Sequence, residues 1–148
     1  MDGLLDVAML DHTGPGVFPL RVWQNTADSG NSFLKVKLVS NGQTIHPQAI
    51  GAKVVLHGLC GGAVARQVTV GSGNMSTDDY TVSFGLGDYY NEKLSLAVTW
   101  PGSAYAVDYA LNSLARGRGS MSWTNCSSPA NKVVTISFEE GIVSCKHA

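Results

Sequence analysis

Hydrophobic and polar residues alternate with a period of two in several short segments of the chain. Within residues 33–39, leucine and valine alternate with two lysines, which is typical of a strand with one dry and one wet face. The same alternation recurs over residues 94–100, where Pro101-Gly102 then ends the run, and over residues 133–138. The pattern predicts a β-strand at each of these three places.

Further apolar runs are separated by turn-forming residues. Residues 4–9 and 17–23 flank Asp-His-Thr-Gly-Pro-Gly, and residues 52–57 and 64–70 flank Gly-Leu-Cys-Gly-Gly. Glycine, proline and aspartate favour tight turns, so each pair of runs is predicted to form a hairpin. Residues 105–116 fit a strand or a short helix equally well, because their apolar positions match both periods.

Several short strands with turns between them predict an all-β fold, and we expect an antiparallel β-sandwich of jelly-roll-like or immunoglobulin-like type. The small polar residues of 25–31 are typical of a linker and mark a boundary in the chain. No internal repeat of useful length is visible after this boundary.

The composition narrows the range of functions. The chain has 148 residues, of which 44% are hydrophobic and 14% charged, and it lacks a long apolar run, so it is expected to be globular and not inserted in a membrane. Ten basic residues against eleven acidic ones give a net charge of −1. The field of the whole chain therefore attracts nucleic acid and anionic lipid only weakly, and no nucleic-acid partner is expected.

Five segments, in order, resemble the ASPIC/UnbV domain over about residues 31–102. They are Asn31-Ser-Phe-Leu-Lys-Val-Lys-Leu-Val-Ser, Ala49-Ile-Gly-Ala-Lys-Val, Arg66-Gln-Val-Thr-Val-Gly-Ser-Gly, Phe84-Gly-Leu-Gly and Leu96-Ala-Val-Thr-Trp-Pro-Gly. The family's domain typically follows an FG-GAP (VCBS) β-propeller. The chain departs from the family pattern between residues 103 and 129.

The first residues are similar to the last repeat of such a propeller, through Asp2-Gly-Leu-Leu-Asp-Val and Leu20-Arg-Val-Trp-Gln-Asn. The resemblance implies a propeller-blade remnant at 1–25 and a sandwich domain at 31–148. The opening residues do not form a signal peptide, so the chain is interpreted as a piece of a longer exported protein. Asp2 and Asp6 match part of the calcium loop of an FG-GAP repeat. They are expected to bind calcium in the parent propeller, and to be solvated carboxylates in this chain, which requires no cofactor of its own.

Three cysteines allow one disulfide and one free or intermolecular thiol. Cys126 and Cys145 bracket the last predicted strand, which favours their pairing, and a bond between Cys60 and Cys145 is the nearest alternative. His57 and Cys60 match half of a zinc motif, but no second pair follows. Two glycosylation sequons begin at Asn74 and Asn125. Together with the resemblance, these features indicate a secreted or cell-surface glycoprotein.

No nucleophile elbow, zinc-protease motif or phosphate-binding loop is present, so we expect no enzyme. Asp78-Asp79 is interpreted as a solvated turn, and the stretch from Arg116 to Arg118 as a flexible basic loop. Tyr89 and Tyr90 follow the Phe-Gly-Leu-Gly run and are the candidate binding residues, because rigid amphipathic rings suit protein and glycan surfaces.

The resemblance and these residues imply a non-catalytic extracellular interaction or adhesion module. It would bind a protein or glycan partner at the cell surface and lie C-terminal to a calcium-binding propeller. Two alternatives stay open: a structural cap that stabilises the propeller without a ligand of its own, and an accessory domain of a carbohydrate-active enzyme.

Overall fold

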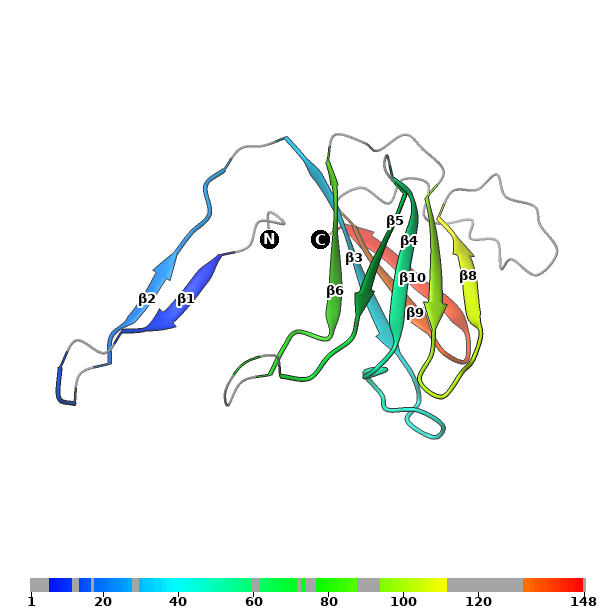
Figure 1. Ribbon diagram of the computed structural model, residues 1–148, viewed down its shortest axis with the longest axis horizontal. Helices are drawn as coiled ribbons and strands as arrows, with labels where there is room; N and C mark the ends of the chain where they lie inside the picture. Colours follow the sequence, from blue (N-terminus) through cyan, green and yellow to red (C-terminus); the bar gives the residue numbers. More distant parts are fainter. Residues whose placement is uncertain are drawn as a thin grey trace. The chain divides into compact units, whose positions relative to one another are not determined.

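The computed structural model describes residues 6–11, 14–16, 18–27, 30–59, 62–71, 73, 77–87, 94–111 and 132–147. These residues form ten strands, and none of them is helical (Figure 1). None of the described segments is therefore a helix that could cross a membrane. The chain divides into two compact units, residues 1–30 and residues 31–148.

The first unit contains a two-stranded hairpin. Strands β1 (Val7–Leu10) and β2 (Leu20–Trp23) pair antiparallel, with Val7 opposite Trp23 and Leu10 opposite Leu20. This confirms the ribbon that was predicted from the two apolar runs and the turn between them.

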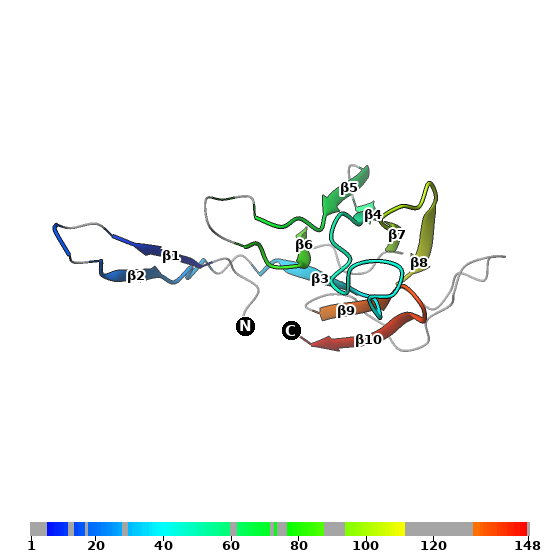
Figure 2. The ribbon, with the colours of Figure 1, turned by 90° about the horizontal axis from the view of Figure 1, so that it is seen from below.

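The second unit contains two four-stranded sheets that face one another as a β-sandwich (Figures 1 and 2). The first has the order β10-β9-β3-β6 and is made of β3 (Ser32–Val39), β6 (Thr81–Gly87), β9 (Lys132–Ser137) and β10 (Gly141–His147). The second has the order β5-β4-β7-β8 and is made of β4 (Lys53–Leu59), β5 (Gly62–Gln67), β7 (Ser95–Thr99) and β8 (Ala106–Ala110). The predicted all-β sandwich is confirmed.

The strand pairs are antiparallel with one exception among those that the structure describes. Strands β3 and β9 run parallel, with Val36 opposite Val134. Parallel neighbours need a long connection, and here the chain passes through both sheets between Val39 and Lys132. The other described pairs are antiparallel, as predicted, and this one parallel pair was not predicted, because local sequence does not specify which distant strands become neighbours.

Strand β8 resolves the ambiguity over residues 105–116 in favour of a strand at Ala106–Ala110. It extends the second sheet as an edge strand paired with β7, with Tyr109 opposite Leu96. The helical alternative is wrong for these residues, because the backbone hydrogen bonds available beside β7 fix an extended conformation. Strands β6 and β10 were not predicted as strands at all.

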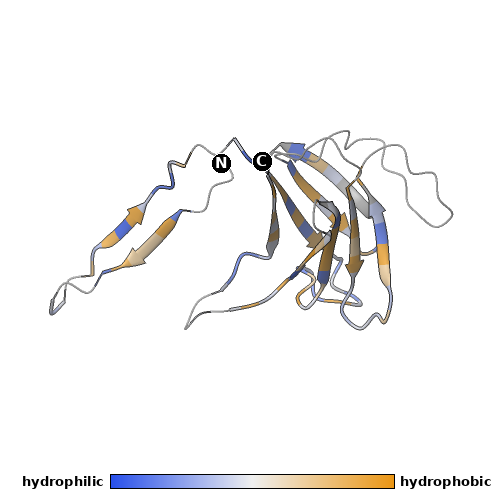
Figure 3. Cartoon of the chain, turned by 45° about the horizontal axis from the view of Figure 1, so that its top comes forward, coloured by the Kyte–Doolittle hydropathy of each residue, from blue (hydrophilic) through white to orange (hydrophobic). Residues whose placement is uncertain are grey.

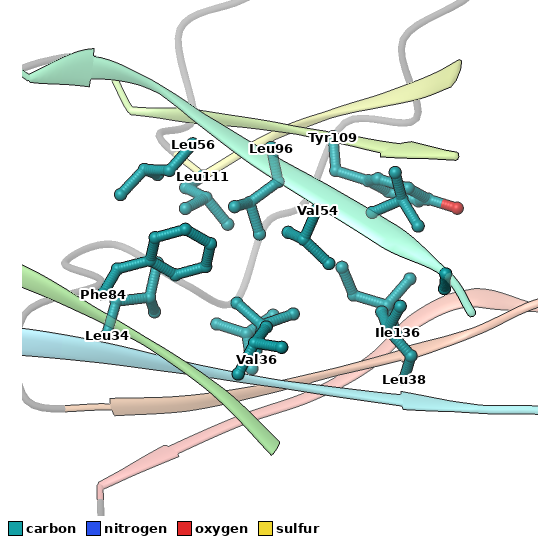
Figure 4. Packing of buried hydrophobic residues seen from close by; sticks show 14 of the residues in the cluster. Leu34, Val36, Leu38, Val54, Leu56, Phe84, Leu96, Tyr109, Leu111 and Ile136 are labelled. Atoms are coloured by element: carbon teal, nitrogen blue, oxygen red, sulfur yellow. The ribbon is translucent and has the colours of Figure 1, made fainter. Parts of the chain in front are cut away.

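The core lies between the two sheets, where the inward residues of both layers interdigitate (Figure 4). Among the described residues, the twelve largest fully buried side chains are less than 2% exposed: Phe84, Leu34, Leu38, Leu56, Leu96, Leu111, Ile136, Val36, Val54, Val68, Val98 and Val134. Burial raises the pKa of the Tyr109 hydroxyl, and a hydrogen bond with the Trp100 side chain partly offsets this rise. Trp100 directly follows β7 and, at 3% exposed, belongs to the core.

The loop between β3 and β4 enters the core through Ala49, which is fully buried and has a φ of +50°. An L-residue adopts this left-handed conformation only where its surroundings hold it there. The Ala49 amide donates to the His46 carbonyl at 2.7 Å, and the Ala49 carbonyl accepts from the Ala52 amide at 3.0 Å. The loop is thus fixed by backbone bonds and by one buried methyl group.

Replacing Phe84 with alanine is expected to destabilise the sandwich by about 3–5 kcal/mol, because a ring that is 1% exposed leaves a cavity between the sheets. Chemical denaturation followed by tryptophan fluorescence measures this loss. Phe18→Ala is the matched control, since Phe18 belongs to the other unit and is 57% exposed. Equal losses in the two variants would contradict the assignment of Phe84 to the core.

Candidate functional site

The hairpin β1–β2 carries apolar side chains on both of its faces. Its register places Ala8, Leu10, Leu20 and Val22 together on one face, which has no polar side chain. These four side chains are all exposed to solvent, and the exposed fraction of Leu10 is 66%. Figure 3 shows the hydrophobic colouring of both strands.

The opposite face of the hairpin is also mostly apolar. Val7, Met9 and Trp23 lie on it beside Arg21, and the exposure of these three apolar side chains ranges from 48% to 57%. A strand with one solvated face alternates apolar and polar residues, whereas strands buried on both faces are apolar throughout. The hairpin therefore has the side chains of a strand pair that is covered on both sides.

Polar contacts at the two ends hold the hairpin together. At one end, the Asn25 amide donates to Asp6 Oδ1 at 2.8 Å. At the other end, Arg21 Nε lies 2.7 Å from Asp11 Oδ2, and the Asp11 amide donates to the Pro19 carbonyl at 3.0 Å. Such an exposed ion pair contributes little to stability, about 1 kcal/mol or less. A lone two-stranded hairpin is marginally stable in water, so these contacts shape the ribbon without giving it a core.

The structure describes one of the two calcium-binding residues that the resemblance predicts. Asp6 is exposed and its carboxylate accepts the Asn25 amide, whereas Asp2 lies outside the described residues. Calcium takes six to eight oxygen ligands, and no group of three or more His, Cys, Asp or Glu side chains that could hold a metal occurs in the described part of the chain. The calcium prediction for Asp2 and Asp6 stays a prediction.

Most of the other predicted site residues lie outside the part that the structure describes. These are the binding tyrosines Tyr89 and Tyr90, the sequon residues Asn74 and Asn125, and Cys126. Cys60, from the zinc alternative and the rival disulfide, lies outside it as well. Their roles stay predictions.

Cys145 is described and lies on β10 opposite Val134, partly buried against the core. It is disulfide-bonded, and its partner lies outside the described residues. The predicted pairing with Cys126 is therefore still a prediction, as is the alternative pairing with Cys60.

The polar residues considered for catalysis take part in local hydrogen bonding. His46 Nδ1 accepts the Gln48 amide at 3.3 Å. Asp79 Oδ1 accepts the Thr81 amide at 3.0 Å, and Asp78 Oδ2 accepts the Thr69 hydroxyl at 3.1 Å. Asp78 and Asp79 precede β6 and are not in a strand, which agrees with their interpretation as a turn.

Glu139 connects two chain segments that are far apart in sequence. Its Oε1 accepts the Asn41 amide at 3.1 Å, and its Oε2 accepts the Ser137 hydroxyl at 2.9 Å. The hydrogen bond from Asn41 lowers the pKa of the Glu139 carboxyl, a small desolvation opposes this, and the Ser137 hydroxyl adds to the lowering. Glu139 therefore ties the loop after β3 to the turn between β9 and β10.

The two-sided apolar surface of the hairpin was missed in the sequence, although the signal is present. Val-Ala-Met-Leu is continuously apolar and Leu-Arg-Val-Trp has a single polar residue, so neither strand alternates as the strands of the sandwich do. A short apolar run of this kind marks a strand that is covered on both faces.

Residues 42–113 match the family model described as ASPIC and UnbV. This segment contains strands β4 to β8. The resemblance to the ASPIC/UnbV domain is therefore confirmed over these residues, whereas the preceding propeller has no such support. No curated protein and no solved structure gives a significant match to the chain.

Replacing Glu139 with glutamine is expected to remove a pH-dependent part of the stability. Because the pKa of this carboxyl is lower in the folded chain than its ordinary value of 4.5, its contribution is present above pH 4.5 and is lost as the pH falls through the folded-state pKa. The wild type should be more stable than the variant at pH 7, and this difference should shrink below pH 4.5. Melting temperatures of the wild type and the variant from about pH 3 to pH 7 measure this stability difference, and Glu140→Gln is the control substitution. A difference that is constant with pH would contradict this role.

Proposed function

We propose that this chain is a non-catalytic extracellular module that acts by contact. Its N-terminal hairpin attaches it to a β-propeller of the same polypeptide, and its sandwich meets a protein or glycan partner at the cell surface. The observation that carries the proposal is the hairpin with apolar side chains exposed on both faces.

The free energy of apolar burial supports an attachment role for the hairpin. Covering a large apolar side chain gains about 1.5–3 kcal/mol, and seven such side chains are exposed on residues 7–23. A soluble chain rarely leaves such a group uncovered unless another surface packs against it. A propeller blade provides this cover, because it is a four-stranded sheet with further blades against both faces.

The resemblance to a repeat of an FG-GAP propeller supports the choice of a propeller over an unrelated protein as the cover. Calcium belongs to the propeller in this proposal, and the sandwich needs none. The match of residues 42–113 to the ASPIC and UnbV family agrees with a domain that performs no chemistry.

The hairpin supports the structural-cap alternative as well, since a cap also buries the last blade. The two functions differ in what the sandwich does. If the sandwich is only a cap, removing it lowers the stability of the propeller and has no other effect. If the sandwich is an interaction module, removing it also abolishes binding to cells or glycans.

The disulfide at Cys145 supports the extracellular part of the proposal. Disulfides persist in oxidising compartments and are rare in the reducing cytosol. Cys145 sits on the edge strand β10, so the bond ties this edge to another part of the chain.

The double substitution Leu10→Lys/Leu20→Lys is expected to lower the binding of an apolar-surface dye to this chain, because one of the two apolar faces of the hairpin becomes charged, without changing the unfolding of the sandwich. The two leucines face the same side of the hairpin, and lysine ends its apolar character. Dye fluorescence and thermal unfolding measure the two effects. Val70→Lys/Tyr105→Lys is the matched control, since both residues are exposed and lie in the sandwich unit.

The attachment is tested in a longer polypeptide that carries the propeller. Amide hydrogens of Val7–Leu10 should exchange slowly there and rapidly in the 148-residue chain, because the propeller covers the hairpin only in the former. Rapid exchange in both polypeptides would rule out the attachment.

The disulfide prediction is tested by single serine variants. If Cys145 pairs with Cys126, Cys60→Ser keeps the disulfide and Cys126→Ser loses it, because only the second change removes the partner. Mass mapping of unreduced peptides distinguishes the variants. Loss of the bond in Cys60→Ser, with retention in Cys126→Ser, would establish the alternative pairing.

A further inference from the structure

The outward face of the first sheet carries a group of lysines. Because Leu34, Val36 and Leu38 point into the core, Lys35 and Lys37 on the same strand point outward. The lysine-bearing face, as we call this surface, is the solvent side of β10-β9-β3-β6.

The strand register extends this face across all four strands. Lys35 lies opposite Ser83 on one side and Val133 on the other, and Val133 lies opposite Lys146. Neighbouring strands are about 4.8 Å apart, so the backbone positions of Lys35 and Lys146 are separated by about 10 Å. Two ammonium groups are therefore anchored in one row on a rigid sheet.

A second row lies beside the first. Lys37 has Thr81 on one side and Thr135 on the other, and Thr135 lies opposite Ser144. These two rows hold three lysines, four hydroxyl side chains and no carboxylate. Lys37 and Lys146 are exposed, and neither makes an ion pair within the described residues.

Among the residues that the structure describes, the acidic groups nearest to this face lie at one end of it. Asp79 precedes Thr81, and Glu139 and Glu140 follow the end of β9, so all three are on the Lys37 side. The row of Lys35 and Lys146 is further from them. Three lysines thus share one face with no carboxylate in their two rows, although the net charge of the whole chain is −1.

An aromatic ring borders the lysine row. Phe33 is half-buried on the outward side of β3, and the Lys35 ammonium lies 5.5 Å from the centroid of its ring. Phe33 is opposite Gly85, and a methyl group added at Gly85 would meet no atom within 4 Å. The sheet is therefore open beside the ring.

We infer that the lysine-bearing face binds a sulfated polysaccharide. Ammonium groups attract sulfates, the hydroxyl side chains match sugar hydroxyls, and an aromatic ring suits the apolar side of a sugar. An extended polymer is favoured over a compact ligand because the charges are spread over a flat sheet. This inference rests on the extracellular part of the proposed function, but not on the hairpin.

Binding of the 148-residue chain to heparin tests the inference. The wild type is expected to bind, and Lys37→Gln/Lys146→Gln is expected to bind about tenfold more weakly, since each lysine near an anionic surface contributes modestly. Raising the salt concentration should weaken wild-type binding more steeply than that of the variant.

The matched control is Lys53→Gln/Arg66→Gln, which removes two exposed positive charges from the other sheet. It should bind heparin like the wild type, and the melting temperatures of all three proteins should agree. No heparin binding at low salt, or an equal loss in both variants, would overturn the inference.

Two further probes distinguish the class of polyanion. Single-stranded DNA and vesicles containing phosphatidylserine carry phosphate groups without a sulfated sugar chain. Binding to either of them as tight as to heparin would overturn the assignment to a polysaccharide. Failure of heparin binding leaves the attachment of the hairpin intact, because hydrogen exchange at Val7–Leu10 tests that separately.

Discussion

The packing of two half-apolar sheets against each other is the constraint on which the rest of the structure depends. Each sheet has one face of Leu, Val, Ile and Phe that is stable only when it is covered, and the other sheet provides the cover. The pleat then leaves every second side chain outside. Positions such as Lys35 and Lys146 are fixed in space because their neighbours Leu34 and Cys145 pack inward.

The hairpin is the part of the chain in which this constraint is not met. It has the backbone pairing of a sheet and apolar side chains on two faces, but the described residues of its unit form no second layer. The sandwich satisfies its own apolar faces, whereas the hairpin requires another surface to do so. Attachment and recognition can therefore belong to different parts of the chain: the apolar ribbon to one and the solvated sheet to the other.

The sequence predicted those elements whose side chains alternate clearly. Strands β3, β7 and β9 follow the expected period of two, and the hairpin of β4 and β5 follows its turn residues. Strand β6 was missed because Gly85 and Gly87 are unfavourable in strands, although Val82, Phe84 and Leu86 keep a regular period of two. Strand β10 was missed because a bulge between Ile142 and Ser144 shifts its period. Glycines and bulges weaken the sequence signal of a strand without ending the strand itself.

The lysine-bearing face could not have been derived from the sequence alone, because it depends on strand register, whereas the apolar runs of the hairpin are visible in the sequence. Lys35, Lys37 and Lys146 are 111 residues apart at their extremes, and only the parallel pairing of β3 with β9 brings them onto one face. A net charge near zero predicts weak long-range attraction of polyanions, but it averages over faces that a sandwich separates. Among the described residues, Asp108 lies on the other sheet and Glu139 and Glu140 lie beyond the end of β9, so a chain with balanced charge can still carry a row of lysines on one sheet.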